Sequence, residues 1–278
     1  KKVTEDYILK QAMPVLDQYK LKYHNYVSSK HKNNAVYFNL GSVSPRSSAT
    51  SYALSNCVSL LMEIRGVGLN RTSFNRRVFT TYLLANSFLN TANTYAEEIQ
   101  SALEKATDFN DEIVIKYKKE KSGYSLNMID VYENKLIPVD VTLHNGLKCK
   151  PVLTRKRPNY YIIESELSSV VEKLKILGLS VGTLKYDELL EIESYKITSL
   201  KKSSELFQGF HENIMTTELV TTKKIFKKGT YVVPMNQKRS NLAVETLEPE
   251  MLSGFLRFNV IEPNDINKIH RYLLNKEL

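Results

Sequence analysis

A short apolar run at residues 58–64 most constrains how this chain of 278 residues can fold. Only Ser59 and Glu63 interrupt the run, and a turn that contains two glycines follows it. Runs of this kind are typical of a strand that is buried on both faces of a parallel sheet between helices. A long helical pattern comes next, from about Phe74 to Lys105. The sequence therefore predicts an α/β protein whose first part contains a mostly parallel sheet.

The pattern changes near residue 109. Three segments with strand patterns follow: 111–119, 135–144 and 158–165. A later segment, 212–235, alternates like a β-hairpin that turns near residue 228. We therefore expect two domains, an α/β domain at 1–108 and a smaller α+β domain at 109–278.

The charge pattern and the apolar pattern of the chain argue against two classes of partner. The formal net charge is +9, and the excess gathers in residues 1–40 and in a lysine-rich stretch at 223–228. Nucleic-acid binders usually interleave such a stripe with aromatic side chains, or carry a known module, and neither is visible here. No stretch reaches the roughly 18 apolar residues that a membrane-spanning helix needs. The sequence thus predicts a solvated lysine surface, with no nucleic-acid partner and no membrane span.

Glu63 is the residue whose position most invites a chemical role. Burying a carboxylate inside an apolar strand is unfavourable unless it is paired or functional. A side chain at the carboxyl end of a parallel strand points toward the crevice where open α/β sheets bind ligands. A structural ion pair between Glu63 and Arg65 explains the same pattern, so both interpretations stay open from the residues alone.

Residues 45–78 resemble the late part of the catalytic domain of bacterial zinc carboxypeptidases (metallocarboxypeptidases). In that family a strand of the type LLxE, followed by T/I-R-G, bears a glutamate that activates a zinc-bound water and then protonates the leaving amine. Glu63 occupies the matching position in LLMEIRG. The resemblance implies that Arg46 and Tyr52 hold the terminal carboxylate of a peptide substrate, and Arg65 is the third candidate for substrate binding. The spacing from Tyr52 to Glu63 is shorter than in the digestive enzymes, and a solvated loop arginine and a packed tyrosine are the alternatives.

The second half of the chain resembles the accessory domain that follows the catalytic domain in some bacterial members. The segment GTYVVPMNQ, residues 229–237, carries this resemblance most specifically. The resemblance therefore covers most of the chain.

The zinc ligands of the family are missing from this sequence. The family binds the metal with an H-x-x-E pair and a later histidine, a set of nitrogen and oxygen ligands that suits zinc. No histidine here has a glutamate three residues later; the histidines are His24, His31, His144, His211 and His270. The opening helix resembles the segment that follows the third ligand in the family. We therefore expect no metal ligands in this chain, zinc only in an intact parent protein, and no peptidase activity for the chain by itself.

Two further expectations concern partners. A catalytic domain that lacks its neighbouring strands exposes a sheet edge and apolar helix faces, so it pairs with the missing N-terminal half or self-associates. The alternative function is a non-catalytic module that binds peptide or cell-wall material. Cys57 and Cys149 have no CxxC partner, so the cellular compartment stays open.

Overall fold

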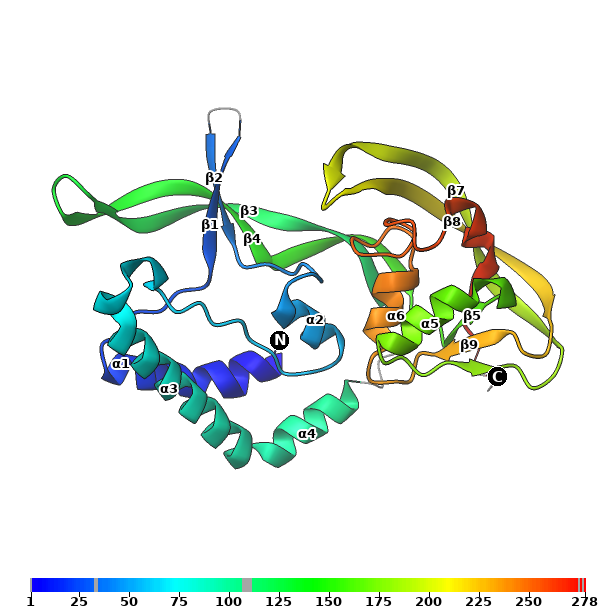
Figure 1. Cartoon of the computed structure of the whole chain (residues 1–278), viewed down its shortest axis with the longest axis horizontal. Coiled ribbons are helices and arrows are strands. Elements are labelled where there is room, and N and C mark those ends of the chain that lie inside the picture. Colours follow the sequence, from blue (N-terminus) through cyan, green and yellow to red (C-terminus); the bar gives the residue numbers. More distant parts are fainter. Residues whose placement is uncertain (1, 33–34, 107–111, 275, 277) are drawn as a thin grey trace. The chain divides into compact units, whose positions relative to one another are not determined.

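The computed structural model describes residues 2–32, 35–106, 112–274, 276 and 278. Helices and two β-sheets make up this chain (Figure 1), which confirms the predicted α/β class. It divides into two compact units, each built from segments that are not contiguous in sequence. Unit 1 comprises Lys1–Thr50, Val58–Ala102 and Tyr117–Lys150, and unit 2 comprises Ser51–Cys57, Leu103–Lys116 and Pro151–Leu278. The predicted domain boundary between residues 108 and 109 lies outside the described residues, so that division stays a prediction.

Two helices, one short and one long, pack together in unit 1. The helical elements up to residue 105 are a π-helical turn at Thr4–Leu9, α1 (Lys10–Gln18), α2 (Ser48–Leu54), a 3-10 turn at Val67–Leu69, α3 (Arg71–Thr94) and α4 (Ala96–Lys105). Gln11 of α1 lies beside Tyr95, and Tyr19 lies beside Phe79, so α1 and α3 run antiparallel. Ala12, Leu16 and Leu84 form the buried cluster between them. The long helical pattern predicted from the sequence is thus two helices, which meet at Tyr95.

The sheet of unit 1 mixes two directions. Its strands are β1 (Val27–Lys32), β2 (Ala35–Leu40), β3 (Glu112–Asp130) and β4 (Lys135–Lys156), in the order β1-β2-β4-β3. β1 pairs with β2 antiparallel, and β2 pairs with β4 in parallel, with Tyr37 opposite Thr142. The mostly parallel sheet expected within residues 1–108 is therefore not formed, because β2 pairs with a strand from the later part of the chain.

Unit 2 is built on a six-stranded sheet in which every described pairing is antiparallel. The strands are β5 (Tyr160–Ile163), β6 (Gly182–Thr183), β7 (Glu188–Phe207), β8 (Phe210–Phe226), β9 (Tyr231–Pro234) and β10 (Ile269–Tyr272), in the order β6-β9-β5-β10-β7-β8. The helical elements of this part are a 3-10 turn at Ser165–Leu167, α5 (Ser168–Ile176), α6 (Ser240–Leu247) and a 3-10 turn at Pro263–Lys268.

Side chains alternate between the two faces of this sheet, as the pleat requires. Tyr161 and Ile163 join the larger hydrophobic cluster with Leu174 of α5 and Leu247 of α6. Ile162, between them in sequence, joins a smaller cluster on the opposite face. The apolar segment around β5 is therefore a strand that is buried on both faces.

Two local predictions in unit 2 are wrong. The hairpin pairs β7 with β8 and turns at Gln208 and Gly209, whereas β9 leaves β8 to pair with β5 and β6. The sequence pattern after Pro263 also predicts a helix, with this proline in its first turn, but the structure has a 3-10 turn followed by strand β10. The strand fills the gap between β5 and β7, so long-range pairing overrides the local helical pattern. None of the helices in the described ranges is long and apolar enough to cross a membrane.

Candidate functional site

The segment that carries Glu63 is not a strand. Residues 57–66 belong to no helix or strand, and Leu61, Met62 and Glu63 are exposed. The prediction of a buried strand at residues 58–64 is therefore wrong for this structure. The physical reason is that none of the described strands pairs with this segment, so its backbone joins no sheet and Leu61 and Met62 stay exposed.

Several contacts nevertheless hold this segment in place. The hydroxyl of Ser59 donates a hydrogen bond of 2.6 Å to the carbonyl of Ala49. Ile64, next to Glu63, packs against the cluster that contains Leu16 and Leu84. Glu63 is thus an exposed side chain on a backbone that is held in place on both sides.

A glycine turn fixes the end of the segment. The carbonyl of Arg65 accepts a hydrogen bond of 3.2 Å from Nη2 of Arg76, and the carbonyl of Gly66 accepts one from the hydroxyl of Ser73. Gly66 has a φ of 117°, and a Cβ at this position would lie 2.8 Å from the Cβ of Ser73. Only glycine fits both the left-handed backbone and this close approach. The glycine-containing turn predicted from the sequence therefore has a specific geometric role.

Glu63 and Arg65 do not pair with each other. Both side chains are exposed, and neither makes an ion pair or a side-chain hydrogen bond with another of the described residues. The structural ion pair considered as the alternative for Glu63 is absent from the part of the chain that the structure describes.

The other two predicted site residues lie apart along the chain. Arg46 is exposed in the turn that precedes α2, and it belongs to unit 1. Tyr52 lies on α2, where it is 64% exposed, and it belongs to unit 2. The alternative interpretation of Tyr52 as a packed tyrosine is therefore wrong, because Tyr52 is an exposed residue of a helix. The bond between Ser59 and Ala49 connects the segments that carry Arg46 and Glu63 within unit 1.

The residues present do not fit a zinc centre. Within the described ranges, no group of three or more histidine, cysteine, aspartate or glutamate side chains could hold a metal ion. His24 is exposed beside the carbonyl of Asn25, and His144 lies beside the ring of Tyr37. Glu63 therefore has no metal ligand set around it in this part of the chain.

A polar cluster that involves three strands of unit 2 was not among the sites predicted from the sequence. The hydroxyl of Ser194 on β7 lies 2.8 Å from Nδ1 of His270 on β10, and Nε2 of His270 lies 2.8 Å from Oε1 of Glu164. Lys224 on β8 donates to the same carboxylate oxygen at 2.5 Å. Burial lowers the pKa of His270, so the neutral ring, with one donor and one acceptor nitrogen, fits between Ser194 and Glu164. These side chains come from distant parts of the chain, so no local motif could have indicated them.

Comparison with known proteins gives a consistent result. The chain is 29% identical over 215 residues to carboxypeptidase 2 of Trichophyton rubrum, a match that covers 76% of this chain and 40% of that protein. It is 28% identical over 212 residues to carboxypeptidase 2 of Trichophyton equinum, covering 75% of this chain. A probable carboxypeptidase 2 of Trichophyton verrucosum is 28% identical over 206 residues.

The chain resembles carboxypeptidases. It spans about 40% of the length of these relatives, which are fungal rather than bacterial. No family model matches the chain, and no solved structure matches it. The similarity supports a carboxypeptidase-like portion of a peptidase, and it agrees with the resemblance read from LLMEIRG.

Proposed function

We propose that this chain is the C-terminal portion of a zinc-dependent, carboxypeptidase-like exopeptidase in which Glu63 is the general base and acid. The observation that carries the proposal is the similarity to proteins named carboxypeptidase 2 over about three quarters of the chain. The anchored segment supports it, because a catalytic carboxylate needs a fixed backbone and an accessible side chain.

The chemistry assigned to Glu63 is proton transfer. A carboxylate accepts the proton of the attacking water while the water oxygen bonds to the carbonyl carbon of the last peptide bond. When the carbon–nitrogen bond breaks, the same carboxyl group returns the proton to the leaving amine. No step through a metal is assigned to these residues, since the described part of the chain holds no ligand set. The zinc of the intact protein would be held by other residues.

Substrate binding is assigned to Arg46, Tyr52 and Arg65. Guanidinium groups bind carboxylates with two parallel hydrogen bonds, and a tyrosine hydroxyl can add another. All three side chains are exposed and thus accessible to the C-terminal carboxylate of a peptide or protein. This assignment rests on the resemblance of residues 45–78 to the family.

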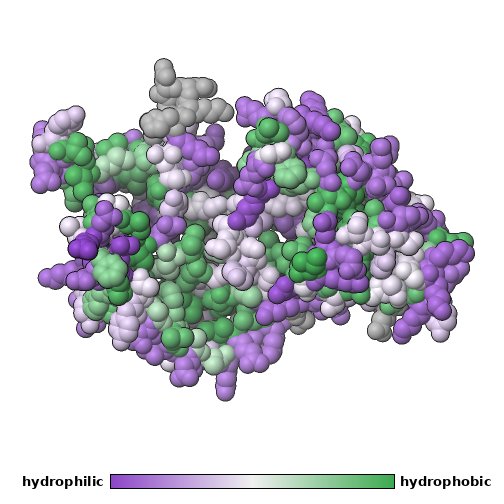
Figure 2. Space-filling model, in the orientation of Figure 1, coloured by the Kyte–Doolittle hydropathy of each residue, from purple (hydrophilic) through white to green (hydrophobic). Residues whose placement is uncertain are grey.

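A second apolar stripe on α3 supports the idea that further chain covers unit 1. One face of α3 packs on α1, while Val78, Tyr82 and Leu89 lie on another face and are 53%, 63% and 72% exposed. Figure 2 shows exposed hydrophobic residues over the region of these helices. A helix with two apolar faces is typical of a buried helix. We therefore assign this stripe, together with the exposed Leu61, to contact with the remainder of the catalytic domain.

The test uses the longer protein encoded by the gene. Release of C-terminal amino acids from peptides is measured for the parent protein, for Glu63→Gln and for the control Glu98→Gln, an exposed glutamate on α4. We expect Glu63→Gln to abolish turnover and Glu98→Gln to leave it unchanged, because glutamine keeps the shape but cannot carry the proton. Turnover that survives Glu63→Gln would show that Glu63 is not the proton carrier.

The chain of 278 residues is tested in parallel. We expect it to release no amino acids, with or without added zinc. Zinc-dependent release by this chain would contradict the proposal that the metal ligands lie elsewhere in the parent protein. Peptide binding without turnover by the longer protein would favour the non-catalytic module instead.

A further inference from the structure

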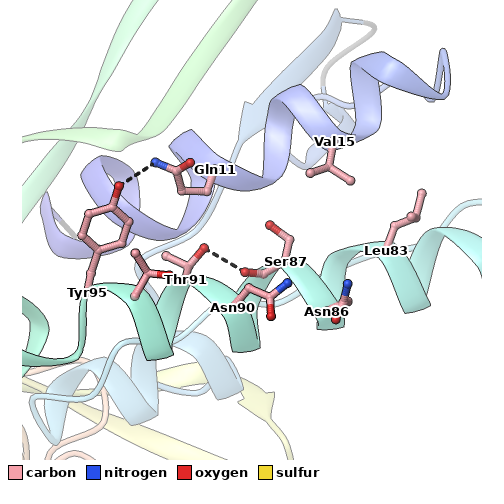
Figure 3. A pocket seen from close by; sticks show the side chains of 9 residues that line it. Gln11, Val15, Leu83, Asn86, Ser87, Asn90, Thr91 and Tyr95 are labelled. Atoms are coloured by element: carbon pink, nitrogen blue, oxygen red, sulfur yellow. Dashed lines mark hydrogen bonds between the residues drawn. The ribbon is translucent and has the colours of Figure 1, made fainter.

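A groove of about 280 Å³ lies between α1 and α3 in unit 1 (Figure 3). Val15 and Leu83 give it an apolar part, while amide and hydroxyl groups make up most of the remaining lining. None of the described residues that line it is charged. Its volume lies just below the range of about 300–1,000 Å³ that is typical of small-molecule pockets. The groove therefore suits a small, uncharged ligand segment that forms hydrogen bonds.

The groove exists because small residues occupy the contact face of α3. Ser87 and Thr91 are buried beside α1, and the hydroxyl of Thr91 donates to the carbonyl of Ser87 at 2.8 Å. Farther along, Nε2 of Gln11 donates to the hydroxyl of Tyr95 at 3.4 Å, which joins the two helices (Figure 3). That distance is long for a hydrogen bond, so the bond between these two groups is weak.

Two amide side chains along the groove have no partner within the described ranges. Asn86 and Asn90 are exposed, and neither makes a hydrogen bond with another described residue. They lie four residues apart on α3, hence on the same side of the helix and about 6 Å apart along its axis. Each amide offers donors and an acceptor in one plane.

This spacing favours one kind of ligand. An extended polypeptide repeats its outward N–H and C=O groups every second residue, about 6.7 Å apart. Two asparagines at about 6 Å can therefore each donate to a peptide carbonyl and accept from a peptide N–H on successive repeats. The absence of charge in the described lining means that the groove selects neither acidic nor basic side chains.

We propose that this groove binds an extended, uncharged polypeptide segment through its main chain, with Asn86 and Asn90 as the paired anchors. Gln11 and Tyr95 contact the same segment at one end of the groove, and Val15 accommodates a small apolar side chain. The proposal does not depend on Glu63, because it concerns binding and not turnover.

The test is a titration followed by heteronuclear NMR on the chain of 278 residues. The probe is an acetylated and amidated hexapeptide of alternating alanine and serine, which has no charge. We expect the side-chain amide resonances of Asn86 and Asn90 to shift with millimolar peptide. The double variant Asn86→Ala/Asn90→Ala should lose about tenfold or more in affinity, as expected for several lost hydrogen bonds.

Three controls make the proposal falsifiable. Asn93→Ala, an exposed asparagine of α3 outside the groove, should keep the affinity. The same peptide with every amide N-methylated should not bind, and this probe needs no variant to fold. Maltotriose, a neutral saccharide, should not compete. Binding that survives the double variant or N-methylation, binding of maltotriose in place of peptide, or no shift at all would each overturn the proposal.

Discussion

Glu250 accepts hydrogen bonds from both terminal nitrogens of Arg155 in the core of unit 2. Nη1 lies 2.7 Å from Oε2, and Nη2 lies 3.0 Å from Oε1. Glu248 accepts a further bond of 2.7 Å from the same Nη1. The backbone N–H and the hydroxyl of Thr217 both donate to Oε1 of Glu250, at 2.8 Å and 2.9 Å. These buried charges are therefore paired and hydrogen-bonded, as a buried ion pair requires.

Glu250→Gln should destabilise unit 2 strongly. The substitution leaves Arg155 buried with less compensating charge, and breaking a buried pair costs about 3–5 kcal/mol. The control is Glu172→Gln, which removes a surface pair with Lys175 that is worth less than about 1 kcal/mol. Urea unfolding of both variants measures the difference. Equal losses of unfolding free energy for the two variants would mean that the buried pair stabilises the fold no more than the surface pair does.

Glu245 should make the stability depend on pH. It is buried on α6, and burial raises its pKa from 4.5 to about 7, although the N–H of Ser253 donates to it at 2.8 Å. The folded state thus holds a proton that the unfolded state releases between these values, so the stabilising contribution is complete below pH 4.5 and is lost as the pH rises through 7. Glu245→Gln should flatten the profile of unfolding free energy in this window. An unchanged profile would contradict the assignment to Glu245.

Gly66→Ala should destabilise unit 1 and disturb the segment of Glu63. The left-handed backbone and the short approach to Ser73 together cost about 1–3 kcal/mol. Gly68→Ala is the matched control, since a Cβ at Gly68 meets nothing within 4 Å. Thermal unfolding followed by circular dichroism distinguishes the two variants. A loss that is as large for Gly68→Ala would show that the local turn geometry is not responsible.

The exposed stripe on α3 should cause this chain to self-associate. Val78→Lys and Tyr82→Lys should weaken the association, because charge on an apolar contact face is unfavourable. Sedimentation equilibrium measures the change, with Asn93→Lys as a control on the same helix. A chain that stays monomeric at every concentration, or variants that associate as well as the original chain, would show that this face does not mediate self-association.

Local pattern predicted much of the fold. The helical pattern that begins near Phe74 and the strand patterns at 135–144 and 158–165 follow from side chains that repeat with the period of their element, and α3, β4 and β5 form there. The pairing of strands did not follow, because β9 and β10 choose their neighbours through the register of distant strands. The predicted hairpin at 212–235 is wrong for the same reason. The alternating side chains of β8 are compatible with pairing to the strand before it or to the strand after it, and β8 pairs with β7.

The candidate site shows a different limit. The glycine turn after Glu63 was visible in the sequence, because a glycine before an arginine-rich helix start is a local signal. The exposure of the run at 58–64 could not be predicted in the same way, because an apolar run forms a buried strand only where partner strands exist to pair with it. The cluster of Ser194 and His270 depends on tertiary contacts alone and leaves no trace in local spacing.

The parallel contact of β2 with β4 has a consequence for how unit 1 assembles. Tyr37 and Thr142 are neighbours across the two strands, yet roughly a hundred residues of chain separate them. A nascent polypeptide must close that long loop before the contact forms, so the order in which the ribosome delivers the strands sets a late step in folding. A chain that ended before β4 would therefore leave β2 without its parallel neighbour.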